Sequence, residues 1–178
     1  MCRISVADAG SANVCAFLDM LAFSEIGAKL LSLTDDGYNV LVGATINNPT
    51  TFDSYAAHPD KVVTLSATLR SSAAGRYQLL FSTWDSIRRK LNLPDFSPVS
   101  QDKAAILLLD QGGALTHIEA GNITQATQVA AAISTESTVW ASLPGSPYGQ
   151  PTNSMTTLLT VYGAALAHYE SLPQALGL

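Results

Sequence analysis

The second half of the chain is a succession of segments with helical periodicity, each closed by residues that stop a helix. The clearest is SPVSQDKAAILLLDQGG, in which Ser97 is expected to cap a helix and Pro98 to take its first position. Gly112 and Gly113 are expected to end that helix. Comparable punctuation recurs from Gln78 onward, so the pattern restricts the fold to one built mainly from helices.

The other helices follow from the same kind of evidence. Trp84, Ile87 and Leu91 recur at helical spacing and predict a helix that stops before Pro94. A short helix is expected to end at Gly121, and ITQATQVAAAI follows it as another.

Two asparagines are expected to cap the first and last helices. Asn13 precedes a first helix over residues 14–25, and Asn153 precedes a last helix that runs to about Tyr169. The last helix is expected to face the core with its large apolar side chains, namely Met155, Leu158, Leu159, Tyr162 and Leu166.

A small sheet is expected between the first helix and the helical half. GYNVLVGATI alternates, with Tyr38, Val40 and Val42 on one face, and predicts a strand. NNPTT has the composition of a turn, and KVVTL, residues 61–65, is expected to be a second strand. The preceding IGAKLLSLTDD is either a loop or an extra helical turn. We therefore predict an α+β fold in one domain over 1–178, mainly helical, with a small antiparallel sheet on one side of a cleft.

Composition narrows the class of protein. The chain has 178 residues, 47% of them hydrophobic and 13% charged, which suits one globular domain or two lobes that share a cleft. A net charge of −5 argues against a nucleic-acid partner, which requires a cationic face. Cys2 and Cys15 form no metal or multi-bridge pattern. We expect a soluble protein made in a cytoplasm, because no segment reads as a signal peptide or a membrane span.

Several chemistries lack their motifs. His58, His117 and His168 are widely scattered, and HExxH is missing, so no metal is expected and each histidine is interpreted as a surface or packing residue. The sequence also lacks GxSxG, a P-loop and GxGxxG, which leaves serine hydrolases and nucleotide enzymes without support. No cofactor is expected.

A carboxylate continues the apolar stripe of the first helix. Val14, Leu18 and Leu21 lie at helical spacing, the next position of the series is Glu25, and Gly27 is expected to end the helix. Apolar surroundings and the negative end of the helix dipole both disfavour a charged carboxyl and raise its pKa. Glu25 is thus a candidate proton donor, with a solvated residue on a frayed helix end as the alternative.

A second candidate region is AAGRYQLL, residues 73–80. Gly75 permits a close backbone approach, while Tyr77 and Gln78 offer a stacking face and an amide that both donates and accepts. The alternative is that Tyr77 and Gln78 only open a helix.

Six blocks, in order, carry a resemblance to a known family: FLDMLAFSE, DGYNVLVG, HPDKVVTL, AAGRYQLL, FSPVSQD and WASLPGSPYGQ. Over roughly residues 15–166 the chain closely resembles the lambda-type phage endolysins, the transglycosylase-type lysozymes of glycoside hydrolase family 104. The resemblance implies a lysozyme-like two-lobed fold. It also implies cleavage of the β-1,4 bond between N-acetylmuramic acid and N-acetylglucosamine in peptidoglycan, with formation of a 1,6-anhydro ring.

The resemblance assigns roles to particular residues. The catalytic glutamate of the family falls on Glu25, which would act first as acid and then as base. Arg76, Tyr77 and Gln78 match a glycan-facing stretch. Residues 144–153 and 58–70 match two opposing lips of the cleft, and Tyr148 and Gln150 are the lip side chains expected to touch saccharide.

The sequence also departs from the family. Ile26 stands where members usually carry Gly, the stretch 26–35 is shorter and more apolar, and the N-terminal extension 1–13 matches nothing in the family. Two alternatives to a lytic transglycosylase remain. One is a hydrolytic muramidase that uses Asp35 or Asp36 as a second carboxylate, where Asp36 otherwise reads as a turn residue. The other is a non-catalytic wall-binding or virion structural protein.

The resemblance implies a partner and a location as well. The partner is the glycan strand of peptidoglycan, with no membrane insertion, and the protein is expected to be a monomer. Without a signal peptide, an endolysin would accumulate in the host bacterial cytoplasm before release to the wall. A virion-associated enzyme would have the same sequence features.

Overall fold

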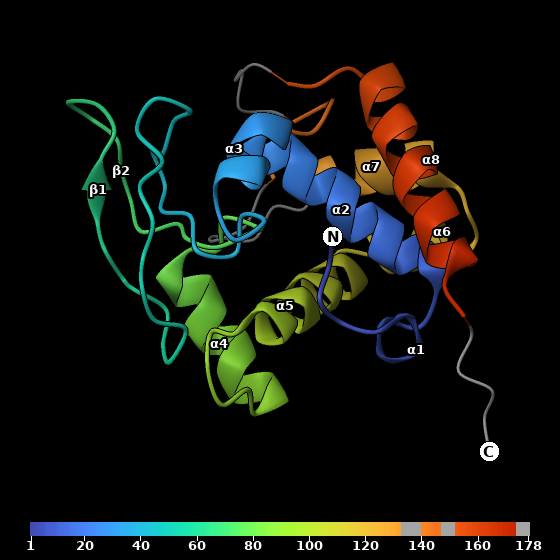
Figure 1. The fold of residues 1–178 in the computed structure, drawn as a ribbon, viewed down its shortest axis with the longest axis horizontal. Coiled ribbons are helices and arrows are strands. Elements are labelled where there is room, and N and C mark those ends of the chain that lie inside the picture. The colour runs from blue at the N-terminus through green and yellow to red at the C-terminus, as the bar shows by residue number, and fades with distance from the viewer. Residues whose placement is uncertain (133–139, 147–151, 174–178) are drawn as a thin grey trace.

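The computed structural model describes residues 1–132, 140–146 and 152–173. Within them the elements are, in chain order, α1 (Val6–Ala9), α2 (Ala12–Ile26), α3 (Ala28–Leu33), β1 (Val63–Thr64), β2 (Arg70–Ser71), α4 (Phe81–Leu91), α5 (Pro98–Gln111), α6 (Ala114–Glu119), α7 (Ile123–Ala131) and α8 (Met155–Ser171). Figure 1 shows α2 through the middle of the molecule, with α6, α7 and α8 to one side and the β1–β2 hairpin at the opposite edge. The predicted α+β, mainly helical architecture is confirmed.

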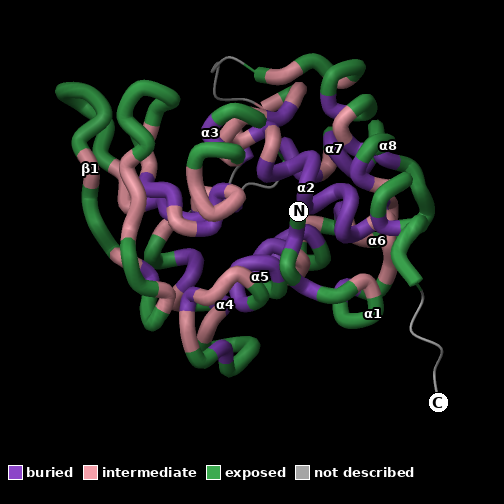
Figure 2. The backbone as a smooth tube through the Cα atoms, viewed as in Figure 1, coloured by how far each residue is buried: buried purple, intermediate pink, exposed green. Residues whose placement is uncertain are grey.

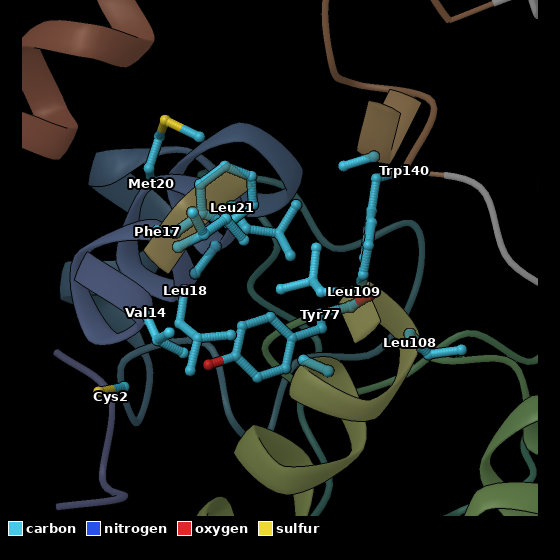
Figure 3. Packing of buried hydrophobic residues seen from close by; sticks show 14 of the residues in the cluster. Cys2, Val14, Phe17, Leu18, Met20, Leu21, Tyr77, Leu108, Leu109 and Trp140 are labelled. Atoms are coloured by element: carbon cyan, nitrogen blue, oxygen red, sulfur yellow. Dashed lines mark hydrogen bonds between the residues drawn. The ribbon is translucent and has the colours of Figure 1, made fainter. Parts of the chain in front are cut away.

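Helix α2 is buried on all sides. Each residue from Val14 to Ala22 is buried, and Phe17, Leu18 and Leu21 have no exposed surface. A helix that packs on every face belongs to the interior of a fold, and α2 contacts α1, α3, α5, α6 and α8. In Figure 3 its side chains meet Tyr77 and Trp140 in the core. The sequence predicted this helix but only one buried stripe.

Serines, not the predicted asparagines, cap the first and last helices. The Ser11 hydroxyl accepts a hydrogen bond from Val14 N at 3.3 Å, and the Ser154 hydroxyl accepts one from Thr157 N at 3.1 Å. The prediction for Asn13 was wrong because this side chain lies inside α2 and makes tertiary contacts. Its Nδ2 donates to Glu119 O at 3.2 Å, and its Oδ1 accepts from the Tyr162 hydroxyl at 2.7 Å.

The small antiparallel sheet exists, but one of its strands was predicted in the wrong place. Strand β1 lies in the predicted 61–65 segment and pairs with β2, with Val63 opposite Ser71. The predicted strand over 37–46 makes only isolated bridges, such as Leu41 with Ala74. Positive φ angles of 85° at Gly37 and 81° at Gly43 turn the backbone at both ends of the apolar run, so it is too short to form a strand.

The helical half agrees closely with expectation. Pro98 opens α5, and Gly112 caps its C-terminal end. Leu159 was predicted to face the core, but it is 37% exposed. Leu91, the last residue of α4, is exposed to the same extent. The ambiguous 26–36 segment contains α3.

The N-terminal extension is folded onto the rest of the chain. Cys2 and Ile4 are buried in the main core, and both cysteines are free thiols. In Figure 2 the segment between the N-terminus and α1 alternates between exposed and buried. Cys2 N donates to the Tyr169 hydroxyl at 2.9 Å, which joins this segment to the end of α8. Among the described helices, none is long and apolar enough to cross a membrane.

Candidate active site

Glu25 lies in the last turn of α2. Gly27 follows with a φ of 83°, and its N–H donates to Phe23 O at 2.9 Å, which ends the helix. Helix α3 begins at the next residue, Ala28, so the chain continues directly into another helix and this helix end is not frayed. The predicted position of the carboxylate at a helix C-terminus is confirmed.

The protonation equilibrium of Glu25 is shifted toward the neutral acid. Desolvation of the carboxyl group raises its pKa to about 7, although hydrogen bonds from the side chain and backbone of Ser142 act in the opposite direction. The Ser142 hydroxyl donates to Glu25 Oε1 at 2.5 Å. A carboxyl group with such a pKa has substantial populations of both forms at neutral pH, as a group that both gives and takes a proton requires.

Ser142 is itself held by two neighbours. Its carbonyl oxygen accepts from the Ser24 hydroxyl and from Asn153 N, each at 3.2 Å. The side-chain amide of Asn153 donates to Ser24 O at 3.4 Å and to Ser24 Oγ at 3.3 Å. These three residues were missed in the sequence, because no local pattern indicates that Ser142 and Asn153 fold back onto the end of α2 and that Ser142 meets the Glu25 carboxyl group.

Arg76 occupies the interior. Its side chain is 1% exposed and forms ion pairs with Asp19 at 2.7 Å and Asp36 at 2.9 Å. The guanidinium also lies over the Tyr38 ring, 5.0 Å from the centroid. Arg76 is therefore committed to internal contacts and presents no surface to a ligand.

Tyr77 is also interior, whereas Gln78 is partly exposed. Tyr77 is 1% exposed, and its hydroxyl donates to Asp102 Oδ1 at 2.6 Å. Gln78 has a φ of 49°, and its Nε2 donates to Gly75 O at 2.9 Å. The alternative that these residues open a helix is wrong, because α4 begins only at Phe81.

Asp36, the candidate second carboxylate, is an ion-pair partner. Desolvation raises the pKa of Asp36, but Arg76 and the amino group of Met1 together lower it by more, so the net shift of the pKa is downward. Its φ of 49° and the following Gly37 place it in a turn, as its alternative interpretation had it. Asp35 accepts hydrogen bonds from the Tyr55 hydroxyl at 2.6 Å and from Arg3 at 3.0 Å.

The divergent stretch after Glu25 packs on this turn. A Cβ atom at Gly37 would lie 2.8 Å from both Ile26 Cδ1 and Leu31 Cδ2. The apolar residues of 26–35 thus cover the turn that carries Asp36. The two predicted lip side chains, Tyr148 and Gln150, lie outside the described residues.

Other candidate features lie elsewhere. A pocket of about 380 Å³ has a lining that includes Ile4, Lys103 and Leu107, and Glu25 is not part of it. Histidines, cysteines and carboxylates of the described ranges form no cluster of three that could hold a metal.

Comparison with known proteins places this arrangement in a family. A sequence profile described as Endolysin matches residues 15–169, most of the chain including Glu25 and Ser142. The chain belongs to the endolysin family. Residues 1–14 lie outside the match.

Two phage endolysins illustrate the relationship. The endolysin of Escherichia phage lambda is 44% identical over 151 residues, which cover 84% of this chain and 89% of the relative. The endolysin of Escherichia phage P2 is 43% identical over 159 residues, which cover 86% of this chain and 92% of the relative. The prediction of an endolysin-type enzyme is confirmed.

Solved structures agree with this endolysin assignment. The bacteriophage lambda lysozyme complexed with a chitohexasaccharide matches with a TM-score of 0.75 and 40% identity, covering 87% of this chain and 94% of that chain. A second structure, lysozyme from bacteriophage lambda, matches with a TM-score of 0.66 and 38% identity, covering 90% of this chain and 93% of that one. The predicted lysozyme-like fold is confirmed.

Proposed function

We propose that this endolysin is a peptidoglycan lytic transglycosylase that cleaves the β-1,4 bond between N-acetylmuramic acid and N-acetylglucosamine. The observation that carries the proposal is the carboxyl group of Glu25, whose pKa of about 7 fits one group that serves as acid and then as base. A relative that binds a chitohexasaccharide supports a β-1,4-linked glycan as the ligand. We expect the enzyme to act as a monomer without metal or cofactor.

The reaction needs two proton transfers at Glu25. The neutral acid protonates the glycosidic oxygen as the bond from C1 to that oxygen breaks. The resulting carboxylate then accepts the proton of the C6 hydroxyl of the same muramic acid as that oxygen attacks C1. Because the nucleophile is intramolecular, effective molarities of roughly 10⁵ M or more replace an activated water. The second carboxylate of ordinary glycosidases is then unnecessary.

The substrate contacts form a separate part of the proposal. Gln78, Tyr148 and Gln150 are assigned to direct contact with glycan. Arg76 and Tyr77, which the sequence also marked as substrate-binding, are assigned an indirect role because each is 1% exposed. They hold the 73–80 segment against the interior, and Gln78 follows them directly.

Mass spectrometry of digested peptidoglycan tests the reaction type. The expected products are anhydro-muropeptides, one water lighter than the products of a hydrolase. Products that end in reducing N-acetylmuramic acid would instead assign the enzyme as a hydrolytic muramidase. A folded protein that clears no outer-membrane-stripped cells would support the wall-binding alternative.

Substitution of Glu25 tests its role. Glu25→Gln removes the transferable proton and is expected to lower the lysis rate by about 10²–10⁴-fold, the usual contribution of general acid–base catalysis. Asp36→Asn is expected to retain most of the activity per folded molecule, since Asp36 takes no part in this mechanism. Equal loss in both variants, with thermal melts that show folded protein, would contradict a single-carboxylate mechanism.

A further inference from the structure

A hydrogen bond from Ser142 restricts the conformation of the Glu25 side chain. Among the described residues, Ser142 is the hydrogen-bond partner of the Glu25 side chain, through Oε1. A glutamate side chain has several rotatable bonds, so an unheld carboxyl group would present its proton to a substrate in only a fraction of its conformations. One fixed oxygen restricts the other to a narrow set of positions.

We propose that Ser142 is a positioning residue for Glu25, and that Ser24 and Asn153 fix Ser142 for that purpose. The kinetic meaning of this inference rests on the proposed function. A serine hydroxyl both donates and accepts, so it can keep its contact with Glu25 as the neutral acid and as the carboxylate. The contact therefore holds through both proton transfers.

The fixing of Ser142 depends on the end of α2. The last carbonyl groups of a helix have no partner within the helix, and Ser24 O is one of them. The Asn153 amide donates to that carbonyl and to the Ser24 hydroxyl, while the same hydroxyl and Asn153 N donate to Ser142 O. Ser142 is thus tied to the helix that carries Glu25 by its backbone, which leaves its hydroxyl directed at the carboxyl group.

The electrostatic consequence has a definite sign. Burial raises the pKa of Glu25 and contacts with Ser142 lower it, and within the part of the chain that the structure describes no charged side chain is among the causes of the shift. Removal of the Ser142 hydroxyl takes away one of the contacts that lower the pKa of Glu25 while burial still raises it. Glu25 is therefore expected to titrate at a higher pH. A merely structural role for Ser142 would not move that titration.

The experiment compares Ser142→Ala with Ser142→Thr, which keeps the hydroxyl. Carbon-13 NMR of the Glu25 carboxyl in the full chain is expected to show a titration about one pH unit higher in Ser142→Ala. The lysis rate on purified peptidoglycan is expected to fall about tenfold. The alkaline limb of its pH profile is expected to move to higher pH by about the same one unit as the titration. Ser142→Thr is expected to restore both properties, and Ser82→Ala, at an exposed serine of α4, to match wild type in both.

A further variant tests the role of the supporting residues. Asn153→Ala keeps Ser142 and is expected to shift the Glu25 titration in the same direction by a smaller amount. An unchanged titration in Ser142→Ala, or in Asn153→Ala if Ser142→Ala does not fold, would overturn the inference. Because the titration needs no substrate, it stands apart from the proposed function, which fails on its own if wild-type protein releases no anhydro products.

Discussion

Glu25 affects the stability of the protein as well as its chemistry. Its carboxyl group has a pKa of about 7 in the folded state, against an ordinary value of 4.5 for a solvated glutamate. The unfolded chain therefore loses this proton at lower pH than the folded protein does. The stability of the folded protein therefore falls as pH rises from about 4.5 to 7. At higher pH the whole of this loss in stability is present.

Glu25→Gln is accordingly expected to stabilise the protein only at higher pH. Denaturant unfolding should give a variant more stable than wild type by about 1–3 kcal/mol at pH 8, with no such difference at pH 4. Glu119→Gln, at an exposed glutamate, is the control, and its stability relative to wild type should be the same at pH 4 and at pH 8. A Glu25→Gln protein no more stable than wild type at pH 8 would show that the carboxyl group is well solvated.

The ion pairs of Arg76 are buried, and we expect them to affect the stability of the protein more than a pair at the surface does. Arg76→Met keeps most of the apolar volume but removes the cation nearest to the buried Asp19, and is expected to destabilise the protein by about 3–5 kcal/mol. Arg88→Met removes a partly exposed pair with Asp85, which keeps its ion pair with Arg89, and should leave stability close to wild type. Equal effects in urea unfolding would contradict a buried network beneath the 73–80 segment.

At the level of elements, His58 joins the loop before β1 to the start of α4. Its ring lies 4.6 Å from the Phe96 centroid and 5.7 Å from that of Phe81. The Asp60 N–H donates to Nδ1 at 3.0 Å, which leaves Nε2 to carry the hydrogen and donate to Leu79 O at 2.9 Å. Of its two expected roles, surface or packing, His58 has the packing one.

This arrangement predicts a pH dependence opposite in sign to that of Glu25. Desolvation lowers the pKa of His58 below 6.5, although the Leu79 carbonyl opposes it, so the unfolded chain binds the proton more readily. The stability contribution of His58 is complete above pH 6.5 and is lost as pH falls below it. His58→Gln is expected to be less stable than wild type at pH 7.5 and to lose less on acidification. His168→Gln, at an exposed histidine, should follow the wild-type curve.

At the level of the whole molecule, Asp102 connects segments far apart in the chain. Its Oδ1 accepts from the hydroxyls of Tyr38 at 2.8 Å and Tyr77 at 2.6 Å. Its Oδ2 accepts from the backbone N–H groups of Arg3 at 2.7 Å and Ile4 at 2.8 Å. One carboxylate in α5 thus joins the N-terminal extension, the 34–38 turn region and the 73–80 segment.

Asp102→Asn is expected to destabilise this junction by about 2–5 kcal/mol, because an amide can accept fewer of these hydrogen bonds and leaves buried donors unpaired. Thermal unfolding with Asp110→Asn, an exposed aspartate on the same helix, provides the comparison. A melting temperature for Asp102→Asn equal to that of Asp110→Asn would show that the N-terminal extension adds little to the fold.

The sequence determined those features that depend on neighbouring residues. Pro98 and Gly112 set the bounds of α5, and the apolar periodicity located the other long helices, because helix formation and termination are local. The same local reasoning placed Glu25 at a helix end, and six ordered blocks identified the family. It failed where local signals compete, as at Asn13, which has the chemistry of a cap but serves a contact between helices.

Only the tertiary structure decided which polar groups meet. Ser142 reaches Glu25, and Arg76 pairs with Asp19 and Asp36, across separations in sequence that no pattern of spacing records. Tyr77 and Arg76 have the side chains of a glycan site, yet both are buried. The physical reason is that desolvation and hydrogen bonding depend on which groups pack around a side chain. In the folded protein those groups come from distant parts of the sequence.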